Sequence, residues 1–282
     1  MVFGVAMILA GCSRREPQSE PVIGLLTDFG LRDPYVAAVK GAIYTVHPSA
    51  RVVDLLHQVE PFQIWQGAYL VEEATREFPK GSIFVTVVDP GVGTERAPIL
   101  LETRSGKFFF APDNGILSLV VEREGMRRAW KLDKPSFYRA GKSSRTFQGR
   151  DIFGPEAARL AAGMDPDQLG SRIEKVESLN LTPASLLGQS FQGQVIYVDH
   201  FGNVITNIPR DLSSRLQEGI LLRISIGEQT IRAPLVGTYA DIPSGKLGAL
   251  FNSSDYLELA MNKNSAAHQL KVSEGTRILV RP

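Results

Sequence analysis

The sequence predicts an α/β N-terminal domain with a mostly parallel sheet, followed by a small C-terminal antiparallel β-barrel domain. In the first part of the chain, apolar runs of strand length alternate with segments of helical periodicity, which is the pattern of βαβ units. After about residue 190, short strands separated by turn residues follow one another with few helices, as in a barrel or sandwich. The 26 glycines and 17 prolines also favour many tight turns over a helical bundle.

The elements of the first domain are expected in a regular order. Residues 21–30, PVIGLLTDFG, form a buried strand that runs into an acid and a glycine. Residues 33–48 carry apolar side chains at helical spacing, with Asp33 as the expected N-cap and Pro34 in the first turn. Further strand and helix patterns of this domain lie at 50–57, 63–79, 81–89, 107–125 and 154–170.

The chain is expected to divide into four parts. These are a lipoprotein-type signal peptide and tether over 1–20, an α/β domain over 21–171, a linker over 172–190 and a barrel over 191–282. The formal net charge is only +1, and there is no basic tract with interleaved aromatic residues. The sequence therefore argues against nucleic acid as a partner.

The N-terminus resembles a bacterial lipoprotein signal. A short apolar run ends in LAGC at residues 9–12, and a polar stretch with two prolines follows. In such signals the cysteine, here Cys12, is lipidated and becomes the mature N-terminus, which would place the protein on the exported side of a membrane. The alternative is a leader with an incidental cysteine and a cytoplasmic protein. Ten apolar residues are too few for a permanent membrane span.

Acidic residues follow or end several predicted strands. Asp28, Asp54 and Asp89 each lie near the carboxyl end of a strand. Ligands of parallel sheets bind beyond that edge, so we expect a polar small-molecule site there. Asp199 follows a strand of the second domain in a similar acid-Phe-Gly context and, like Asp28, could accept hydrogen bonds from sugar hydroxyls or an amine. Asn203 could supply an amide for a base or a carboxylate. The alternative for each is a residue that only forms a turn.

The loop DPGVGTER, residues 89–96, has the composition of a reactive site. It lacks the Lys-Ser/Thr of a P-loop and the glycine spacing of a dinucleotide fingerprint. Pro90 and Gly91 favour a tight turn, and Gly93 allows a close approach of the backbone to a neighbour. Such a loop could bring Asp89 and Arg96 to one pocket. The alternative is a turn with a surface acid and a solvated arginine.

Five motifs together resemble the S-adenosylmethionine (SAM) hydroxide adenosyltransferases, which are related to fluorinating and chlorinating enzymes that act on SAM. The motifs are TDFG, VVDPGVGTER, PDNG, GRDIFGP and DHFGNVITNI, in the order of the family, and the resemblance runs from about Val22 to Pro282. It implies an α/β domain, a β-barrel and a homotrimer with active sites between subunits. It also implies hydrolysis of SAM to adenosine and L-methionine, without a cofactor or a metal.

The resemblance assigns Asp89 and Arg96 to a water-activating Asp-Arg-His triad. The third position is Gln148, where the family has histidine. Glutamine can orient a water but cannot take its proton near neutral pH. The chain is therefore expected to be a hydrolase of reduced activity, with a lipid-anchored binder of SAM or adenosine as the alternative and a halide transferase as a third reading. His57, His200 and His268 are expected to be structural.

The same resemblance implies a set of substrate-binding residues from both domains. Asp28 would hold the ribose hydroxyls, Phe62 would contact the ribose and sulfonium, and Tyr239 would stack on adenine. The full set is Asp28, Asp33, Tyr35, Phe62, Gly149, Asp199, Phe201, Asn203, Tyr239, Ser253, Ser254, Glu258 and Met261. The alternative for the residues of the second domain is a role in the barrel core and its turns.

Overall fold

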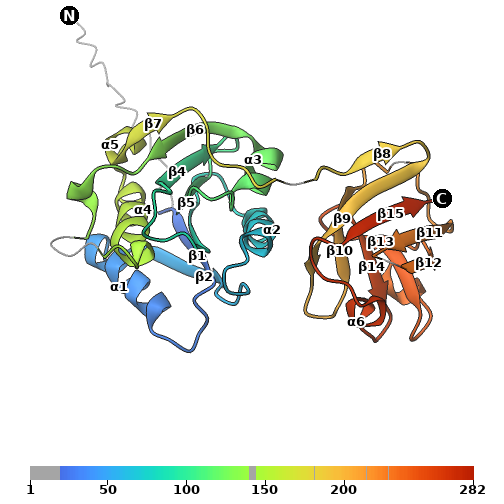
Figure 1. Ribbon diagram of the computed structural model, residues 1–282. Helices are drawn as coiled ribbons and strands as arrows, with labels where there is room; N and C mark the ends of the chain where they lie inside the picture. Colours follow the sequence, from blue (N-terminus) through green and yellow to red (C-terminus); the bar gives the residue numbers. More distant parts are fainter. Residues whose placement is uncertain (1–19, 140–143, 181, 214, 228) are drawn as a thin grey trace, which may run out of the picture.

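The computed structural model describes residues 20–139, 144–180, 182–213, 215–227 and 229–282. Within these ranges the chain forms two domains, each built on its own sheet (Figure 1). The expected signal segment, with Cys12, lies outside the described residues. Among the described helices, none has the length and apolar character that crossing a membrane requires.

The first domain contains a seven-stranded mixed sheet. Among the described residues, three strand pairings are parallel and three are antiparallel, so the expectation of a mostly parallel sheet is not confirmed. The antiparallel half contains strands at 98–103 and 126–131, for which the sequence analysis predicts no element. In sheet order the strands are β2 (Arg51–Leu56), β1 (Val22–Thr27), β3 (Ile83–Val87), β5 (Phe108–Pro112), β4 (Pro98–Thr103), β6 (Met126–Lys131) and β7 (Ser171–Ile173).

Helices cover both faces of this sheet and form a three-layer domain. On one face, α1 (Tyr35–Val46) and α4 (Gly154–Ala161) pack on side chains such as Leu25 and Phe110. On the other, α2 (Ile64–Thr75) and α3 (Ser118–Glu124) pack on the neighbouring residues Leu26 and Phe109. Successive strand residues thus point to opposite faces, and both faces are buried.

Helix α1 begins one residue later than the sequence pattern indicates. Pro34 occupies the N-cap position, and no side chain caps the helix. The side chain of Asp33 is exposed and accepts no capping hydrogen bond from the helix, so its expected capping role is wrong. The fixed φ of proline is compatible with a helix start, which lets the chain enter α1 without a capping side chain.

The second domain is an antiparallel barrel that is nearly closed. Its described strand pairings are all antiparallel, and an isolated bridge between Leu235 and Ala249 connects the two ends of the sheet. A short helix, α6 (Ala266–Leu270), packs beside it. The strands are β8 (Ser185–Leu187), β9 (Ser190–Val198), β10 (Val204–Pro209), β11 (Leu221–Ile226), β12 (Gln229–Pro234), β13 (Leu247–Phe251), β14 (Tyr256–Met261) and β15 (Arg277–Arg281).

The domain boundaries remain a prediction. The end of β7 and all of β8 fall inside the segment 172–190 that the sequence analysis assigns to a linker. Part of the connection also packs on the first domain, because the Glu177 N–H donates to Asp113 and the Leu179 N–H donates to Ser118. The connection is therefore partly structured.

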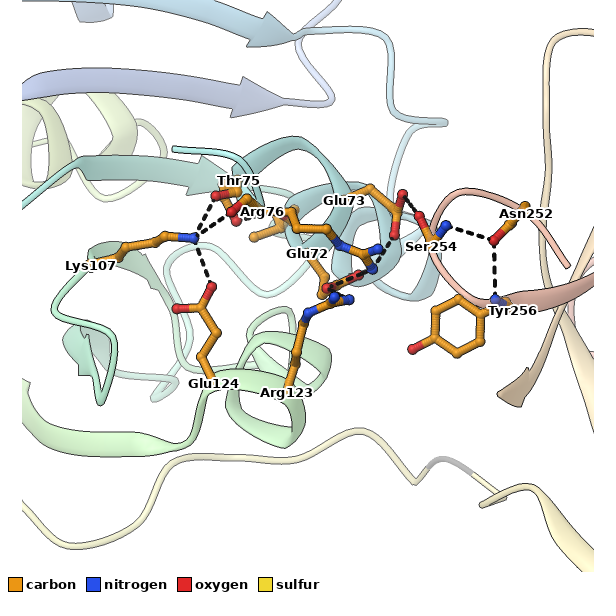
Figure 2. Close-up of polar contacts among 11 residues, drawn as sticks. Glu72, Glu73, Thr75, Arg76, Lys107, Arg123, Glu124, Asn252, Ser254 and Tyr256 are labelled. Atoms are coloured by element: carbon orange, nitrogen blue, oxygen red, sulfur yellow. Dashed lines mark hydrogen bonds and ion pairs between the residues drawn. The ribbon is translucent and has the colours of Figure 1, made fainter. Parts of the chain in front are cut away.

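The two domains contact each other through α2. Tyr69 of α2 lies against Tyr197 of β9, with ring centroids 5.0 Å apart, and Leu119, Ile196 and Ile205 complete a small apolar cluster. Figure 2 shows the polar part of this contact, in which the Ser254 hydroxyl of the second domain donates to Glu73 of α2.

Candidate active site

A pocket of about 270 Å³ lies at the carboxyl ends of β1 and β3. Three of its lining residues, Asp28, Asp89 and Gly149, come from three separate motifs, and Gln148 directly precedes the third. This is the edge at which ligands bind in open α/β sheets. Asp54, the other acid expected at this edge, does not line the pocket and instead pairs with Lys40 and His57.

Asp89, Arg96 and Gln148 form one hydrogen-bonded cluster. Arg96 donates to both carboxylate oxygens of Asp89, with Nε 3.0 Å from Oδ1. Nη2 of Arg96 also donates to Oε1 of Gln148 at 2.7 Å. The side chains of Asp89 and Arg96 are almost fully buried, so this ion pair is weakly screened by solvent. The alternative of a surface acid and a solvated arginine is therefore wrong.

The backbone of the loop explains how seven residues bring the pair together. Val92 N–H donates to the Asp89 carbonyl and Thr94 N–H donates to the Gly91 carbonyl, which reverses the chain twice. Gly93 has φ of +84°, and a Cβ there would lie 3.1 Å from the Arg145 carbonyl oxygen. The expected close approach at Gly93 is confirmed.

The orientation of Gln148 limits what it can do. An arginine only donates hydrogen bonds, so the amide oxygen of Gln148 must face Arg96 and its amide N–H groups face away. Gln148 lines the pocket and starts the segment that enters a π-helical turn over Gly149–Phe153. Such turns are rare and often occur at functional sites. Gln148 can therefore donate a hydrogen bond from its amide N–H groups, while its one acceptor oxygen is engaged with Arg96.

Asp28 also lines the pocket. Its Oδ2 accepts a 3.1 Å hydrogen bond from the Phe62 N–H. Burial raises the pKa of Asp28 and the nearby charge of Asp89 adds to this rise, whereas the Phe62 N–H opposes it. Phe62 has a φ of +69°, which is unusual for a phenylalanine, and its side chain is 70% exposed. This strained, exposed aromatic residue is typical of a binding site.

The second domain has its own pocket, of about 610 Å³. Asp199 accepts hydrogen bonds from the Phe201 N–H and from both the backbone and side-chain N–H groups of Asn203. Phe201 is 75% exposed at the mouth. The loop of residues 199–203 therefore forms a turn and also lines the pocket, so the two alternatives expected for Asp199 and Asn203 occur together. The lining residues are Asp199, Phe201, Asn203, Tyr239, Met261, Asn262, Lys263, Asn264 and Ser265.

Tyr239 and Glu258 form a pair beside this second pocket. The Tyr239 hydroxyl donates to Oε1 of Glu258 at 2.8 Å, and the Glu258 side chain is buried. Burial raises the pKa of Glu258, which the bond from Tyr239 opposes. Glu258 does not line the pocket, so it contacts the site through Tyr239.

The structure does not bring every expected site residue into these two pockets. Tyr35 and Gly149 line the first pocket, but the exposed Asp33 does not. Ser253 is exposed outside the second pocket, and Ser254 is buried against Glu73 at the domain contact. Ser253 and Ser254 lie on the turn between β13 and β14, which faces α2 of the same chain.

Phe29, Phe147 and Asn114 were not predicted from the sequence as site residues. Phe29 and Phe147 pack edge to face with the expected site residue Tyr35, with centroids 5.5–6.0 Å apart, and the three rings form one wall of the first pocket. Phe29 belongs to TDFG and Phe147 lies two residues before GRDIFGP, so the motifs could have indicated both. Asn114 of the PDNG motif donates to the Val88 carbonyl at 2.9 Å and fixes the end of the strand before Asp89.

Comparison with known proteins identifies the family. Residues 23–170 match the SAM hydroxide adenosyltransferase N-terminal domain, and residues 193–279 match the C-terminal domain of the same family. The chain belongs to this family. The resemblance indicated by the five motifs is therefore confirmed.

Relatives with assigned names fall into two groups. An (R)-S-adenosyl-L-methionine hydrolase of Thermus thermophilus is 36% identical over 89% of this chain and 95% of its own length. The protein of the same name from Methanocaldococcus jannaschii is 32% identical over 89% and 92%. A fluorinase of Nocardia brasiliensis is 29% identical over 93% and 97%.

Two solved structures share the fold along nearly the whole chain. An uncharacterized conserved protein from Thermotoga maritima has a TM-score of 0.88 and 35% identity, covering 92% of this chain and all of that one. A conserved hypothetical protein from Thermus thermophilus has a TM-score of 0.76 and 34% identity, covering 92% and 99%.

Proposed function

We propose that this protein hydrolyses S-adenosyl-L-methionine to adenosine and L-methionine. The observation that carries this proposal is the cluster of Asp89, Arg96 and Gln148 beside a pocket that also contains Asp28 and Phe62. Its support from relatives is the set of proteins named (R)-S-adenosyl-L-methionine hydrolase, which are 32–36% identical over most of the chain.

The reaction is a displacement at the 5′ carbon of the ribose. The oxygen of a water forms the new C–O bond while the C–S bond breaks, and the sulfonium departs as the neutral thioether of methionine. No general acid is required, because the leaving group takes the electron pair without a proton. The water loses one proton, so the site must hold the water opposite sulfur and favour its hydroxide character.

The three residues of the cluster divide this work. Asp89 accepts a hydrogen bond from the water and receives its proton, while Arg96 stabilises the negative charge nearby. Gln148 donates an amide N–H to the water oxygen and thereby orients it. Asp28 accepts hydrogen bonds from the ribose hydroxyls, and the wall of Phe29, Tyr35 and Phe147 excludes bulk water.

The second pocket supplies the other half of the site in this proposal. Asp199 and Asn203 bind the amine and carboxylate of the methionine portion, and Tyr239 stacks on adenine. The two pockets share no lining residue, and each exposes an aromatic side chain, Phe62 in one and Phe201 in the other. We therefore propose a homotrimer in which the first pocket of one subunit meets the second pocket of its neighbour.

Quantifying adenosine and methionine after incubation with SAM tests the activity. Asp89→Asn is expected to lower the rate by about 10²–10⁴-fold while SAM binding stays within about tenfold, because Asp89 serves the water. Asp255→Asn is a matched control, since Asp255 is an exposed carboxylate that pairs with Arg210. Weaker binding by Asp89→Asn with an unchanged rate for bound substrate would contradict the assignment.

A binding protein without turnover is the second candidate. It is favoured by one observation, that the only acceptor oxygen of Gln148 already binds Arg96. SAM binding measured by calorimetry, together with no adenosine formed over many hours, would support it. A halide transferase is tested in the same assay with fluoride and chloride added, by a search for 5′-halogenated product.

We also propose that Cys12 is lipidated and anchors the protein on the exported side of a membrane. The proposal is supported by LAGC at 9–12 and the polar tether that follows. In a bacterial host, Cys12→Ser should move the protein from the membrane fraction to a soluble fraction. Wild-type protein recovered from the cytosol with an intact Met1 would contradict this.

A further inference from the structure

A chain of four hydrogen-bonded side chains lies behind the first pocket without lining it. Thr27, the last residue of β1, is buried, and its Oγ1 lies 2.9 Å from Nδ1 of His57. Nε2 of His57 lies 3.0 Å from Oδ1 of Asp54, and Oδ2 of Asp54 accepts a 2.6 Å bond from Lys40 of α1. His57 itself is 4% exposed.

A bulge in β2 brings His57 beside Thr27. Strands β1 and β2 pair in parallel, with Leu25 opposite Asp54 and Leu26 opposite Leu56, so that one residue of β2 is extra. Continuing this register by one residue sets His57 level with Thr27. Without the bulge, Leu56 would stand at that level and the hydroxyl of Thr27 would face an apolar side chain.

With a neutral His57, chemistry fixes which atom donates and which accepts in each hydrogen bond of this chain of side chains. A carboxylate only accepts, so Nε2 of His57 donates to Asp54 and Nδ1 accepts from the Thr27 hydroxyl. The Thr27 oxygen accepts in turn from the Phe29 N–H at 3.2 Å. Each donor thus has an acceptor, and both ring nitrogens are engaged. His57 is therefore not free to replace the general base that Gln148 cannot supply.

The same residues tie together two segments that form the pocket. The Gly30 N–H donates to the His57 carbonyl at 2.7 Å, and the Phe62 N–H donates to Asp28. The segment of residues 27–30 is thus bonded to both His57 and Phe62, the two ends of the segment 57–62. Asp28, Phe29 and Phe62 line the pocket, whereas Thr27 and His57 stand behind it.

We infer that Thr27 and His57 are positioning residues, which hold the backbone of residues 28–30 and through it the carboxylate of Asp28. The inference rests on the proposed function only in assigning Asp28 to the substrate. Loss of the Thr27 hydroxyl would remove a hydrogen-bond partner from the half-buried Phe29 N–H and from the buried Nδ1 of His57, so the loop would relax. The cluster around Asp89 would keep its own hydrogen bonds.

The test compares Thr27→Val, which is isosteric but lacks the hydroxyl, with Thr27→Ser, which restores it. Thr27→Val should raise KM for SAM by about tenfold and leave kcat within about threefold, because substrate positioning is lost and water activation is kept. Thr27→Ser should behave like wild type. Thr75→Val is the matched control, since Thr75 is equally buried and its hydroxyl only bonds the Val71 carbonyl within α2.

Amide hydrogen exchange of residues 28–30 gives a second readout that does not require turnover. Exchange there should be faster in Thr27→Val than in wild type, Thr27→Ser or Thr75→Val. Equal KM values and equal exchange in Thr27→Val and Thr75→Val would overturn the inference. A wild-type protein that forms no adenosine would refute the proposed function instead, and the exchange comparison would still decide whether Thr27 holds this loop.

Discussion

The amide oxygen of Gln148 accepts a hydrogen bond from Arg96, and an amide cannot take a proton from water near neutral pH, so this side chain can orient a water but not deprotonate it. A histidine at this position could accept from the water through one ring nitrogen. Proton acceptance therefore falls to Asp89 alone, whose two oxygens already receive hydrogen bonds from Arg96. A carboxylate held by a cation is a weaker base than a free one.

Gln148→His is expected to raise the rate of SAM hydrolysis by up to about 10²-fold, the low end for a positioned general base. The pH profile of the single-turnover rate should gain an ionisation near the ~6.5 of an unperturbed histidine, with the faster rate on the alkaline side. Single-turnover rates of both proteins from about pH 5 to 9 check this.

Two results would contradict that expectation in different ways. If neither protein forms adenosine although both bind SAM, the site has lost more than its histidine. If wild type is already fast and the substitution is neutral or harmful, Asp89 and Arg96 suffice to prepare the water. Gln148→Asn serves as a control, because it keeps the amide but shortens its reach toward Arg96.

At the scale of helices and strands, the sequence predicted well wherever periodicity and motifs agreed. The strand before Asp28, the strand before Asp89 and helix α2 all lie where the patterns indicate. Strands β4 and β6 were missed, and they are the reason why the sheet is mixed. PILLET at 98–103 is flanked by the loop of Arg96 and a turn, and nothing in its local pattern specifies an antiparallel partner, which only the folded sheet supplies.

The site residues were predicted well where local chain geometry decides their position and poorly where distant parts of the chain decide it. Asp89 and Arg96 are seven residues apart on one loop, so local turn chemistry was enough to bring them together. Whether Ser254 faces a ligand or the other domain depends on how two domains pack, and the sequence near Ser254 carries no such information. The role of Asp33 stays a prediction, because its side chain is exposed at the start of α1 and does not line the first pocket.

Helix α4 contains a fully buried carboxyl that the proposed mechanism does not use. Neither oxygen of Glu156 has a hydrogen-bond partner among the described residues. Burial raises the pKa of Glu156 to about 8, although Arg159 nearby opposes the shift. The folded protein therefore keeps a proton that the unfolded chain, with an ordinary carboxyl pKa of 4.5, has already released.

Glu156→Gln is expected to stabilise the protein increasingly as pH rises. The wild-type free energy of unfolding should fall between about pH 4.5 and 8 and level off above, whereas the variant lacks this ionisation. The difference should be small near pH 4.5 and on the order of 2–4 kcal/mol near pH 8. Urea denaturation at several pH values measures it.

Glu124→Gln is the control, because Glu124 is also partly buried but paired. Burial would raise its pKa, yet the hydrogen bond from Lys107 lowers it overall. Its replacement should therefore destabilise the protein at neutral pH, and the difference should vanish as pH falls below the ordinary carboxyl pKa. A stability difference for Glu156→Gln that is constant from pH 5 to 9 would show that its carboxyl does not titrate in this range.

For the whole molecule, the contact between the two domains fixes the position of the first pocket relative to the second. Figure 2 shows a polar network that runs from Lys107 through Arg76 and the acidic pair Glu72 and Glu73 to Ser254. Arg76 donates to both glutamates and so offsets the repulsion between them. Together with the stacking of Tyr69 on Tyr197, this network fixes the barrel against α2.

The two pockets of one chain share no lining residue. A site made from both pockets would then be completed by a second copy of the chain. Mixing two inactive variants tests this directly. Asp89→Asn disables the first pocket and Asn203→Ala disables the second, and each variant alone should be nearly inactive.

Co-expression of these two variants in equal amounts should restore activity if sites form between subunits. A site is intact only when its first pocket comes from the Asn203→Ala chain and its second pocket from the Asp89→Asn chain, so random assembly gives about one quarter of the wild-type activity per site. Sites formed within one chain would give no recovery, because every chain carries one defect. The mass of the assembly, measured by light scattering, distinguishes a trimer from other closed rings with the same recovery. Co-expression of Asp89→Asn with Arg96→Ala is the control, because both changes lie in the same pocket and no mixed assembly can contain an intact one.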